Sequence, residues 1–437
     1  MKKTSNLFLK STFILIISGF LTKFFGFIIR VVYTRIIGID GINLYSIATP
    51  TYSLLLTIAT LAIPTSISKL IAEATQNKKR CLKILTSSAL IIIVINILII
   101  IIMFLTSDFI ACSLLKEPRS EYILKAMALT LPFVSISSVF KGYFYGKQNM
   151  IPHATSNIIE QIFRLIIILI VLPILIKISV IYAVIGLVLL TIISEIISII
   201  IFLFFLPKHI YYDRSLIIPN KSTTKSILDI SLPTVSSRII GNIGYFFEPI
   251  ILTNFLIFSG YTSNYVLMEY GAYNAYALTL LTMPSFFIAA ISMSLLPEIS
   301  KYYSSNNKKM VKKRINQGLF FAIIIGILFT FFIFLFRDKL LFFLYKTTNG
   351  SDYIKILAPF FFLFYLEGVM ISSLQALNKA KLTMKISFFG VIIKLISLMI
   401  LSLCHIGLYS LVFSEIINII FVVGVNYYYL KKEIKDT

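Results

Sequence analysis

The chain has 437 residues, of which 58% are hydrophobic and only 13% are charged, and its mean hydropathy is +0.94. Because soluble domains average about 25% charged residues, this composition excludes a soluble enzyme, a secreted domain and a nucleic-acid-binding module. It also excludes an outer-membrane barrel, whose strands alternate in polarity and give a weaker apolar signal. The composition is typical of a helical membrane protein.

Twelve apolar stretches follow one another along the chain, each long enough for a transmembrane helix, which takes about 20 residues. The first follows Met1-Lys2-Lys3 as a signal peptide would, but it has no small-residue cleavage site and continues through Lys23 and Arg30, so we interpret it as a span. The predicted spans are residues 11–34, 44–66, 84–106, 122–146, 156–176, 179–206, 226–258, 271–298, 315–336, 353–377, 383–404 and 406–430.

The Lys and Arg residues are unevenly distributed between the two ends of these spans. When those near the end of a span are counted with the adjoining loop, 26 lie on the side of the N-terminus, nine lie on the other side and five lie deeper within spans. Because cytoplasmic loops carry an excess of Lys and Arg, this count predicts that both termini are cytoplasmic in a bacterial inner-membrane protein. It also explains most of the net charge of +22 without a nucleic-acid partner.

Four short motifs recur in the same order in the two halves of the chain. They predict two six-helix lobes, residues 1–206 and 226–437, joined by a cytoplasmic linker at 207–225. An even number of helices per half makes the repeats parallel, an arrangement that transporters use around a central cavity. We therefore expect an all-α integral membrane protein of about 12 helices. The matched motifs are Ser194–Ile200 with Ser414–Ile420, Ile67–Lys69 with Ile299–Lys301, Lys23–Gly26 with Arg238–Gly241, and Pro132–Phe133 with Pro359–Phe360.

Three cations within the spans are candidates for substrate binding. A cation at mid-membrane costs roughly 2.5–3.5 kcal/mol on insertion scales, so each should face water or a partner. Lys23 and Arg30 share one helix face with Gly19, Gly26 and Thr34, and Arg238 occupies the place in the second repeat that Lys23 has in the first. Cations from both repeats would suit a diphosphate, which arginine binds bidentately. The alternative is pairing with a membrane carboxylate, for example Arg238 with Glu248.

The carboxylates within the spans are candidates for ion coupling or gating. Glu195 and Glu415 occupy matching places in the two repeats, and Glu248 lies ten residues beyond Arg238. The alternative for the matched pair is buried hydrogen bonding to a neighbouring helix. For the other membrane charges we expect structural pairing: Glu160 with Arg164 as a local pair, and Glu367 and Lys394 with partners of their own.

Signals for an enzyme are poor. The three histidines are scattered, no carboxylate motif for a metal-bound diphosphate is present, and we expect neither a metal nor a cofactor. The stretch Gly142–Lys147 has a spacing unlike that of a phosphate-binding loop. We interpret Gly142 and Gly146 instead as a small-residue face that packs closely against another helix.

Several longer stretches together resemble a known family. They are LTKFFGFIIR with the following segment to Glu73, FKGYFYGKQNMIPHATSNIIEQIFRL at 140–165, ISLPTVSSR at 230–238 and SMSLLPEISK at 292–301. These look like the stage V sporulation protein B group of polysaccharide transporters, which is similar to the lipid II flippases of the multidrug/oligosaccharidyl-lipid/polysaccharide exporter superfamily.

The resemblance implies a two-lobe fold with alternating access and movement of an undecaprenyl-diphosphate-linked saccharide, lipid II or a related cell-wall or polysaccharide precursor, to the outer leaflet. Lys23 falls where related flippases place a cation, and Arg30 matches an arginine of the group. Related lipid II flippases often carry two further C-terminal helices and cations in helices 2 and 8 that this sequence lacks, so another lipid-linked sugar stays open. The partners implied are that lipid-linked saccharide, membrane lipids and a coupling proton or sodium ion.

Three other readings stay open at the level of sequence. An ion-coupled multidrug or cation antiporter of the same superfamily should have acidic residues dominating its cavity, whereas the deepest charges in the first and seventh spans are cationic. A membrane-embedded glycosyl- or acyltransferase would need catalytic acids or a histidine that this sequence lacks. The third reading is a scaffold for envelope or spore-coat assembly.

Overall fold

The computed structural model describes residues 2–74, 77–206 and 221–436, and every regular element in them is helical. The chain divides into two compact units, Met1–Phe246 and Phe247–Thr437. Most of the predicted linker, residues 207–220, lies outside the described residues, so the division into lobes at 207–225 stays a prediction. The boundary between the two observed units falls between residues 246 and 247, within a helix that begins after this stretch.

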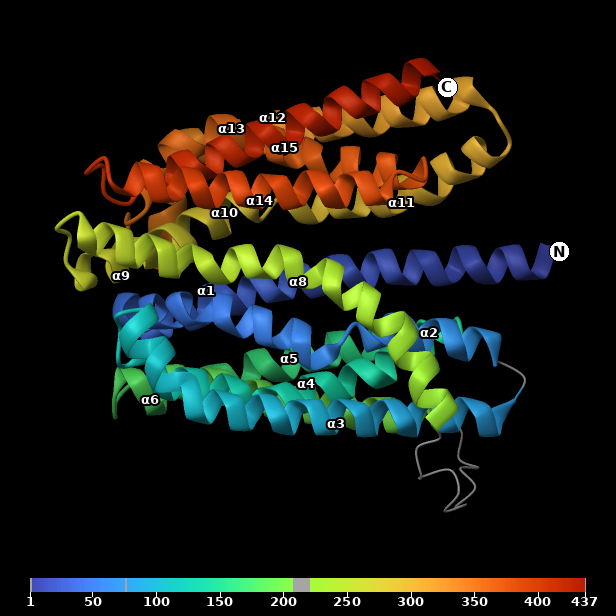
Figure 1. The fold of residues 1–437 in the computed structure, drawn as a ribbon, viewed down its shortest axis with the longest axis horizontal. Helices are drawn as coiled ribbons and strands as arrows, with labels where there is room; N and C mark the ends of the chain where they lie inside the picture. The colour runs from blue at the N-terminus through green and yellow to red at the C-terminus, as the bar shows by residue number, and fades with distance from the viewer. Residues whose placement is uncertain (1, 75–76, 207–220, 437) are drawn as a thin grey trace. The chain divides into compact units, whose positions relative to one another are not determined.

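In its described residues the first unit has six helices and the beginning of α8 (Figure 1). A six-residue π-helical turn, η1, extends the third of them. Their bounds are α1 Lys2–Thr60, α2 Ile63–Glu73, α3 Lys78–Asp108, η1 Phe109–Leu114, α4 Ser120–Gly146, α5 Ile151–Leu175, α6 Val180–Phe205 and the first part of α8, which runs over Lys221–Phe258.

The second unit holds the rest of α8 and the remaining helices, with a second π-helical turn, η2, between two short ones. Figure 1 shows long helices of this unit running side by side. Their bounds are α9 Ser263–Gly271, η2 Ala272–Ala277, α10 Leu278–Thr282, α11 Ser285–Ser304, α12 Lys308–Tyr345, α13 Ser351–Ala376, α14 Ala380–Ser402 and α15 Tyr409–Asp436.

The helices are long because a chain in hydrocarbon must satisfy its backbone hydrogen bonds within each segment. Ten helical segments of the described residues are long and apolar enough to cross a membrane, and α9 to α11, bent by 49°, count as an eleventh. One of the ten runs over 57 residues, about twice what one span needs. Counting it as two gives the twelve spans predicted from the sequence.

A reversal at Gly38 divides α1 into those two spans. Gly38 has φ 71° and ψ −172°, a conformation reserved almost entirely for glycine. The rings of Tyr33 and Tyr45 lie 5.6 Å apart, whereas twelve residues of straight helix would separate them by about 18 Å. The two arms of α1 therefore run in opposite directions from this point (Figure 1).

The second span of each half is interrupted. Leu61 and Ala62 both have left-handed backbone angles between α1 and α2, and Pro64 stands in the first turn of α2. In the second unit the break falls at Met283 and Pro284, between α10 and α11. Broken spans in corresponding halves of a repeat are a feature of transporter binding regions.

The glycines of α4 allow the broken helix α2 to approach closely. A Cβ at Gly142 would lie 2.8 Å from the Cα of Pro64, and one at Gly146 would lie 2.7 Å from the Cβ of Ile71. Both distances are too short for a real side chain. The predicted packing role of these glycines is confirmed, and a buried apolar cluster that includes Ile67 and Tyr143 surrounds the contact.

Replacing Gly38 with alanine is expected to lower the stability of the protein. The backbone angles there cost a residue with a Cβ about 1–3 kcal/mol, although the added methyl group itself meets open space. Gly26→Ala is the matched control, since Gly26 is helical and equally uncrowded, and it should be neutral or slightly stabilising. Melting temperatures in detergent decide the comparison, and equal values for the two variants would contradict the reversal at Gly38.

Candidate functional site

The first two predicted cations lie on the N-terminal arm of α1. The side chain of Lys23 is exposed, and that of Arg30, about two turns further on, is half-buried. A Cβ added at Gly19 or Gly26 would meet nothing within 4 Å, so the helix face around Lys23 is open. Among the described residues, no hydrogen bond or ion pair involves the Lys23 ammonium group. Lys23 is therefore available to an outside anion.

The third predicted cation, Arg238, lies in a polar seam between the first part of α8 and the helices before and after the Leu61–Ala62 break. Its Nη2 donates to Thr65 Oγ1 at 3.3 Å. One turn further along α8, Asn242 donates to Thr57 Oγ1 at 2.7 Å and accepts from Ser53 Oγ at 3.1 Å. The guanidinium group of Arg238 stays exposed, so it retains donors for a ligand.

The seam continues towards the beginning of α8, where the hydroxyls of Ser66 and Ser231 share a hydrogen bond of 2.7 Å in the buried interior. Sequence reasoning missed Asn242 and these hydroxyl groups because single Ser, Thr and Asn residues in an apolar span carry no pattern. The structure contains no contact between Lys23 and Arg238, so their joint action on one ligand stays a prediction.

Two carboxylates of the second unit pair with one buried lysine. Lys394 on α14 places its ammonium nitrogen 2.6 Å from Glu248 Oε2 on α8, and it also pairs with Glu415 on α15. Tyr270 donates to the other oxygen of Glu248 at 3.4 Å. Glu367 on α13 lies near enough to interact electrostatically with Glu415. Two carboxylates thus pair with one cation, and a third lies near one of them.

This cluster decides two alternatives left open by the sequence. Lys394 has its own ion-pair partners, as we expected. The suggested pairing of Arg238 with Glu248 is not found, because Glu248 pairs with Lys394 instead. The side chain of Glu248 is only 4% exposed and that of Lys394 17%, so the charges are largely removed from solvent. Such a cluster is sensitive to the gain or loss of a single charge.

The first unit has a smaller charged cluster at the related place. Arg164 on α5 pairs with Glu160 at 3.1 Å, which confirms the predicted local pair, and donates to Ser194 on α6 at 2.9 Å. Glu195 is 5% exposed, and its Oε2 accepts no hydrogen bond from the residues that the structure describes. The repeat mates therefore differ, because Glu415 has a lysine partner and Glu195 forms no ion pair within the described ranges.

No group of three or more His, Cys, Asp and Glu side chains that could hold a metal ion is found in the described part of the chain. The candidate residues thus offer cationic side chains at Lys23, Arg30 and Arg238, and an ion-pair cluster largely removed from solvent at Lys394.

The family described as "Polysaccharide biosynthesis protein" matches residues 8–303, which is more than half of the chain. The chain belongs to this family. A second family, MatE, matches residues 249–400. The family assignment confirms the resemblance drawn from Lys23 and the stretches that follow it.

Curated relatives support the same membership. "Stage V sporulation protein B" of Bacillus subtilis is 34% identical over 394 residues, which cover 89% of this chain and 76% of the relative. "Lipid II flippase MurJ" of the same organism is 22% identical over 431 residues, with 90% of this chain and 77% of the relative covered. These family members are similar to this chain over most of its length, in both halves.

Solved structures show the same fold. A multidrug resistance MATE family transporter of the MOP superfamily, in an inward-facing conformation, has a TM-score of 0.78 over 95% of both chains at 14% identity. A MOP superfamily transporter from Pyrococcus furiosus has a TM-score of 0.68 at 13% identity, with 98% of this chain and 96% of that chain covered. The protein is thus a multi-pass membrane protein with the fold of these transporters.

Removing the central cation of the acidic cluster is expected to destabilise the second unit. Lys394→Met leaves Glu248 and Glu415 without a counter-charge, which costs about 3–5 kcal/mol for a buried pair. Melting in detergent measures the loss. The triple variant Lys394→Met/Glu248→Gln/Glu415→Gln should recover most of it, because it leaves no unpaired charge.

The matched control is Lys125→Met, which removes a lysine that pairs with Glu121 at 2.5 Å nearer to solvent. An ion pair this close to solvent contributes little to stability, because water screens it, so this variant should melt close to the wild type. Equal melting temperatures for Lys394→Met and Lys125→Met would contradict the assignment of a buried charge cluster.

Proposed function

We propose that the protein is a flippase of the bacterial cytoplasmic membrane, with both termini cytoplasmic. Its substrate is an undecaprenyl-diphosphate-linked saccharide, lipid II or a related cell-wall or polysaccharide precursor, and it moves this lipid to the outer leaflet by alternating access. The observation that carries the proposal is the 34% identity to the stage V sporulation protein over 89% of the chain, together with family membership. Among relatives, one is named for flipping lipid II.

In this proposal the diphosphate is bound by Lys23 and Arg238, with Arg30 as the next cation along α1. Support comes from the exposed side chains of Lys23 and Arg238, which cost free energy in a membrane unless water or an anion meets them. The seam supports the role of Arg238, because Thr65 engages only one of its donors and orients the guanidinium group. Arginine then has further N–H groups for phosphate oxygens.

No residue of the proposed site forms a covalent intermediate, and the protein acts as a transporter without a cofactor. The acidic cluster supplies the coupling element. A proton or sodium ion arriving at Glu248, Glu415 or Glu367 would change the charge balance around Lys394. Since Glu248 belongs to α8 and Glu415 to α15, the change acts on the packing of two spans at once. Glu195, which has no cation partner among the described residues, is the competing candidate in the first unit.

The second candidate function is an ion-coupled multidrug or cation antiporter. The observation in its favour is the fold shared with MATE family transporters, and the acidic cluster of the second unit would suit a cationic drug. The exposed cations Lys23 and Arg238 favour the flippase, because they would repel such a drug.

Binding of lipid II to the purified protein tests the proposed site. Native mass spectrometry should detect lipid II on the wild type and about tenfold or greater loss in Lys23→Ala/Arg238→Ala, since each charged hydrogen bond is worth about 1.5–3 kcal/mol. Lys78→Ala/Arg80→Ala removes the same two residue types from an exposed helix end and should bind as the wild type does.

Three outcomes of this measurement are distinct. Equal binding of lipid II by the wild type and Lys23→Ala/Arg238→Ala contradicts the proposed diphosphate site but leaves the proposed flippase function in place. Binding of another undecaprenyl-linked sugar in place of lipid II changes the substrate within the class. If the wild type binds neither lipid II nor another undecaprenyl-linked sugar, but takes up a cationic dye, the antiporter function is favoured.

Coupling is tested by flipping of fluorescent lipid II in proteoliposomes under an imposed proton or sodium gradient. Glu415→Gln is expected to abolish the effect of the gradient while lipid II binding is unchanged, because it removes one charge of the cluster without changing its shape. Glu195→Gln is the same substitution at the matching place of the first repeat and should keep the gradient effect. The reverse result would move the coupling element to the first unit.

A further inference from the structure

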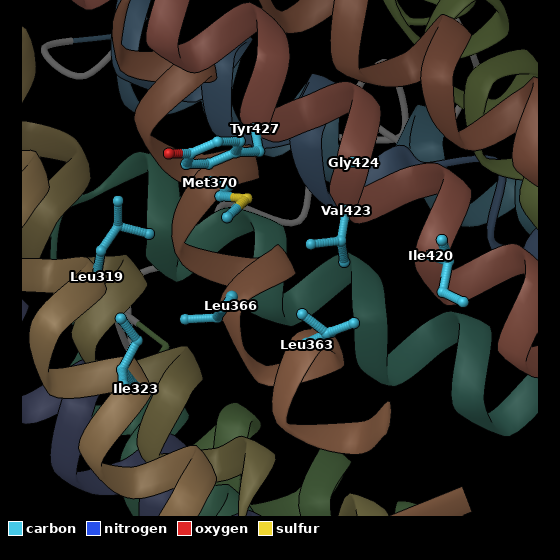
Figure 2. A pocket seen from close by; sticks show the side chains of 9 residues that line it. All are labelled: Leu319, Ile323, Leu363, Leu366, Met370, Ile420, Val423, Gly424 and Tyr427. Carbon is cyan, nitrogen blue, oxygen red and sulfur yellow. The ribbon is translucent and has the colours of Figure 1, made fainter. Parts of the chain in front are cut away.

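The second unit contains an apolar groove that is separate from the charged residues discussed so far. Its cavity has a volume of about 360 Å³, within the roughly 300–1,000 Å³ of small-molecule sites. Figure 2 shows α12 on one side, α15 on the other and α13 between them. The lining residues are Leu319, Ile323, Leu363, Leu366, Met370, Ile420, Val423, Gly424 and Tyr427.

Only one polar side-chain group, the hydroxyl of Tyr427, belongs to this lining. The depth of the groove depends on Gly424, where an added Cβ would meet nothing within 4 Å. Exposed apolar side chains flank it, including Phe320 and Phe321 on α12 and Tyr428 on α15. An apolar groove on an apolar face is suited to a hydrocarbon chain.

Positively charged side chains at one end of the groove indicate which lipid headgroup would fit there. Lys312 precedes Leu319 by seven residues and Lys431 follows Tyr427 by four, so each lies on the groove face of its helix. Both lysines are exposed, and neither forms an ion pair within the described ranges. Two described carboxylates towards this end have other partners, since Glu298 pairs with Arg314 and Glu433 with Lys379.

An apolar groove that leads to two unpaired lysines matches a lipid with an anionic headgroup. We propose that this groove binds an anionic glycerophospholipid of the bilayer, with one acyl chain between α12 and α15 and its phosphate at Lys312 and Lys431. The lipid belongs to the leaflet at the C-terminal end of α15, which the distribution of Lys and Arg predicts to be cytoplasmic. This bound lipid is distinct from the transported substrate proposed above, whose diphosphate is assigned to Lys23 and Arg238.

The test compares phosphatidylglycerol with phosphatidylethanolamine on the purified full-length protein, by native mass spectrometry. The wild type should retain phosphatidylglycerol about tenfold better, because each lysine at a membrane surface adds attraction for anionic lipid. Gly424→Phe, which fills the groove, should lose the bound lipid. Lys312→Gln/Lys431→Gln should keep a lipid and lose the preference for the anionic one.

Matched controls separate the groove from general effects of bulk and charge. Val94→Phe adds an aromatic ring at an exposed site of α3 and should retain phosphatidylglycerol as the wild type does. Lys313→Gln/Lys432→Gln removes two exposed lysines adjacent in sequence to Lys312 and Lys431, off the groove face, and should keep the preference. If Gly424→Phe does not fold, the comparison of Lys312→Gln/Lys431→Gln with Lys313→Gln/Lys432→Gln still tests the proposal.

Equal retention of the two phospholipids by the wild type would overturn the proposal, as would unchanged retention in Gly424→Phe. A third arm adds undecaprenyl phosphate as a competitor. Undecaprenyl phosphate could displace phosphatidylglycerol from the wild type and fail to bind Gly424→Phe. In that case the groove holds the isoprenoid chain of a substrate, and the phospholipid proposal is wrong. Lipid II binding at Lys23 and Arg238 is measured separately, so the two proposals fail independently.

Discussion

The cost of charge in hydrocarbon is the constraint on which the rest of this structure depends. Where no water can solvate a charged or polar side chain, it must find a partner inside the protein or face a cavity. Lys394 meets this requirement with Glu248 and Glu415, and Arg164 meets it with Glu160 and Ser194. Except for the pair of Arg164 with Glu160 within α5, these contacts join different spans, so they also hold helices together.

Charged side chains in the spans that keep hydrogen-bond donors without a protein partner indicate places where water or a ligand can reach. Lys23 on its open helix face and Arg238 in the seam retain exposed donors, and so does the pair of lysines at the end of the apolar groove. A folded membrane protein that keeps such groups has them where water or an anionic ligand can reach them. The proposed diphosphate site and the proposed phospholipid site both follow from this one argument, applied to different units.

The interruptions of the helices depend on the same requirement, that polar groups in a membrane have partners. Gly38 permits a reversal that residues with a Cβ disfavour, and the break at Leu61 and Ala62 lies next to hydroxyl groups that engage Arg238 and Asn242. Irregular backbone at this depth is tolerated where side chains or water satisfy it. The seam along α8 therefore combines a broken span with an exposed cation, the two features that the proposed transport mechanism requires.

The sequence by itself determined the class of fold and the family, because hydropathy and motifs are properties of the chain that need no contacts. It also pointed to the charges of the proposed site, since an ionisable residue in an apolar run is conspicuous. What it could not provide was which charges meet. Glu248 and Lys394 are separated by nearly 150 residues, and no periodicity relates them, so only the packing of α8, α14 and α15 decided that Glu248 pairs with Lys394 rather than with Arg238. The groove beside Gly424 was equally invisible, because a cavity is space left between three helices and has no pattern in any one of them.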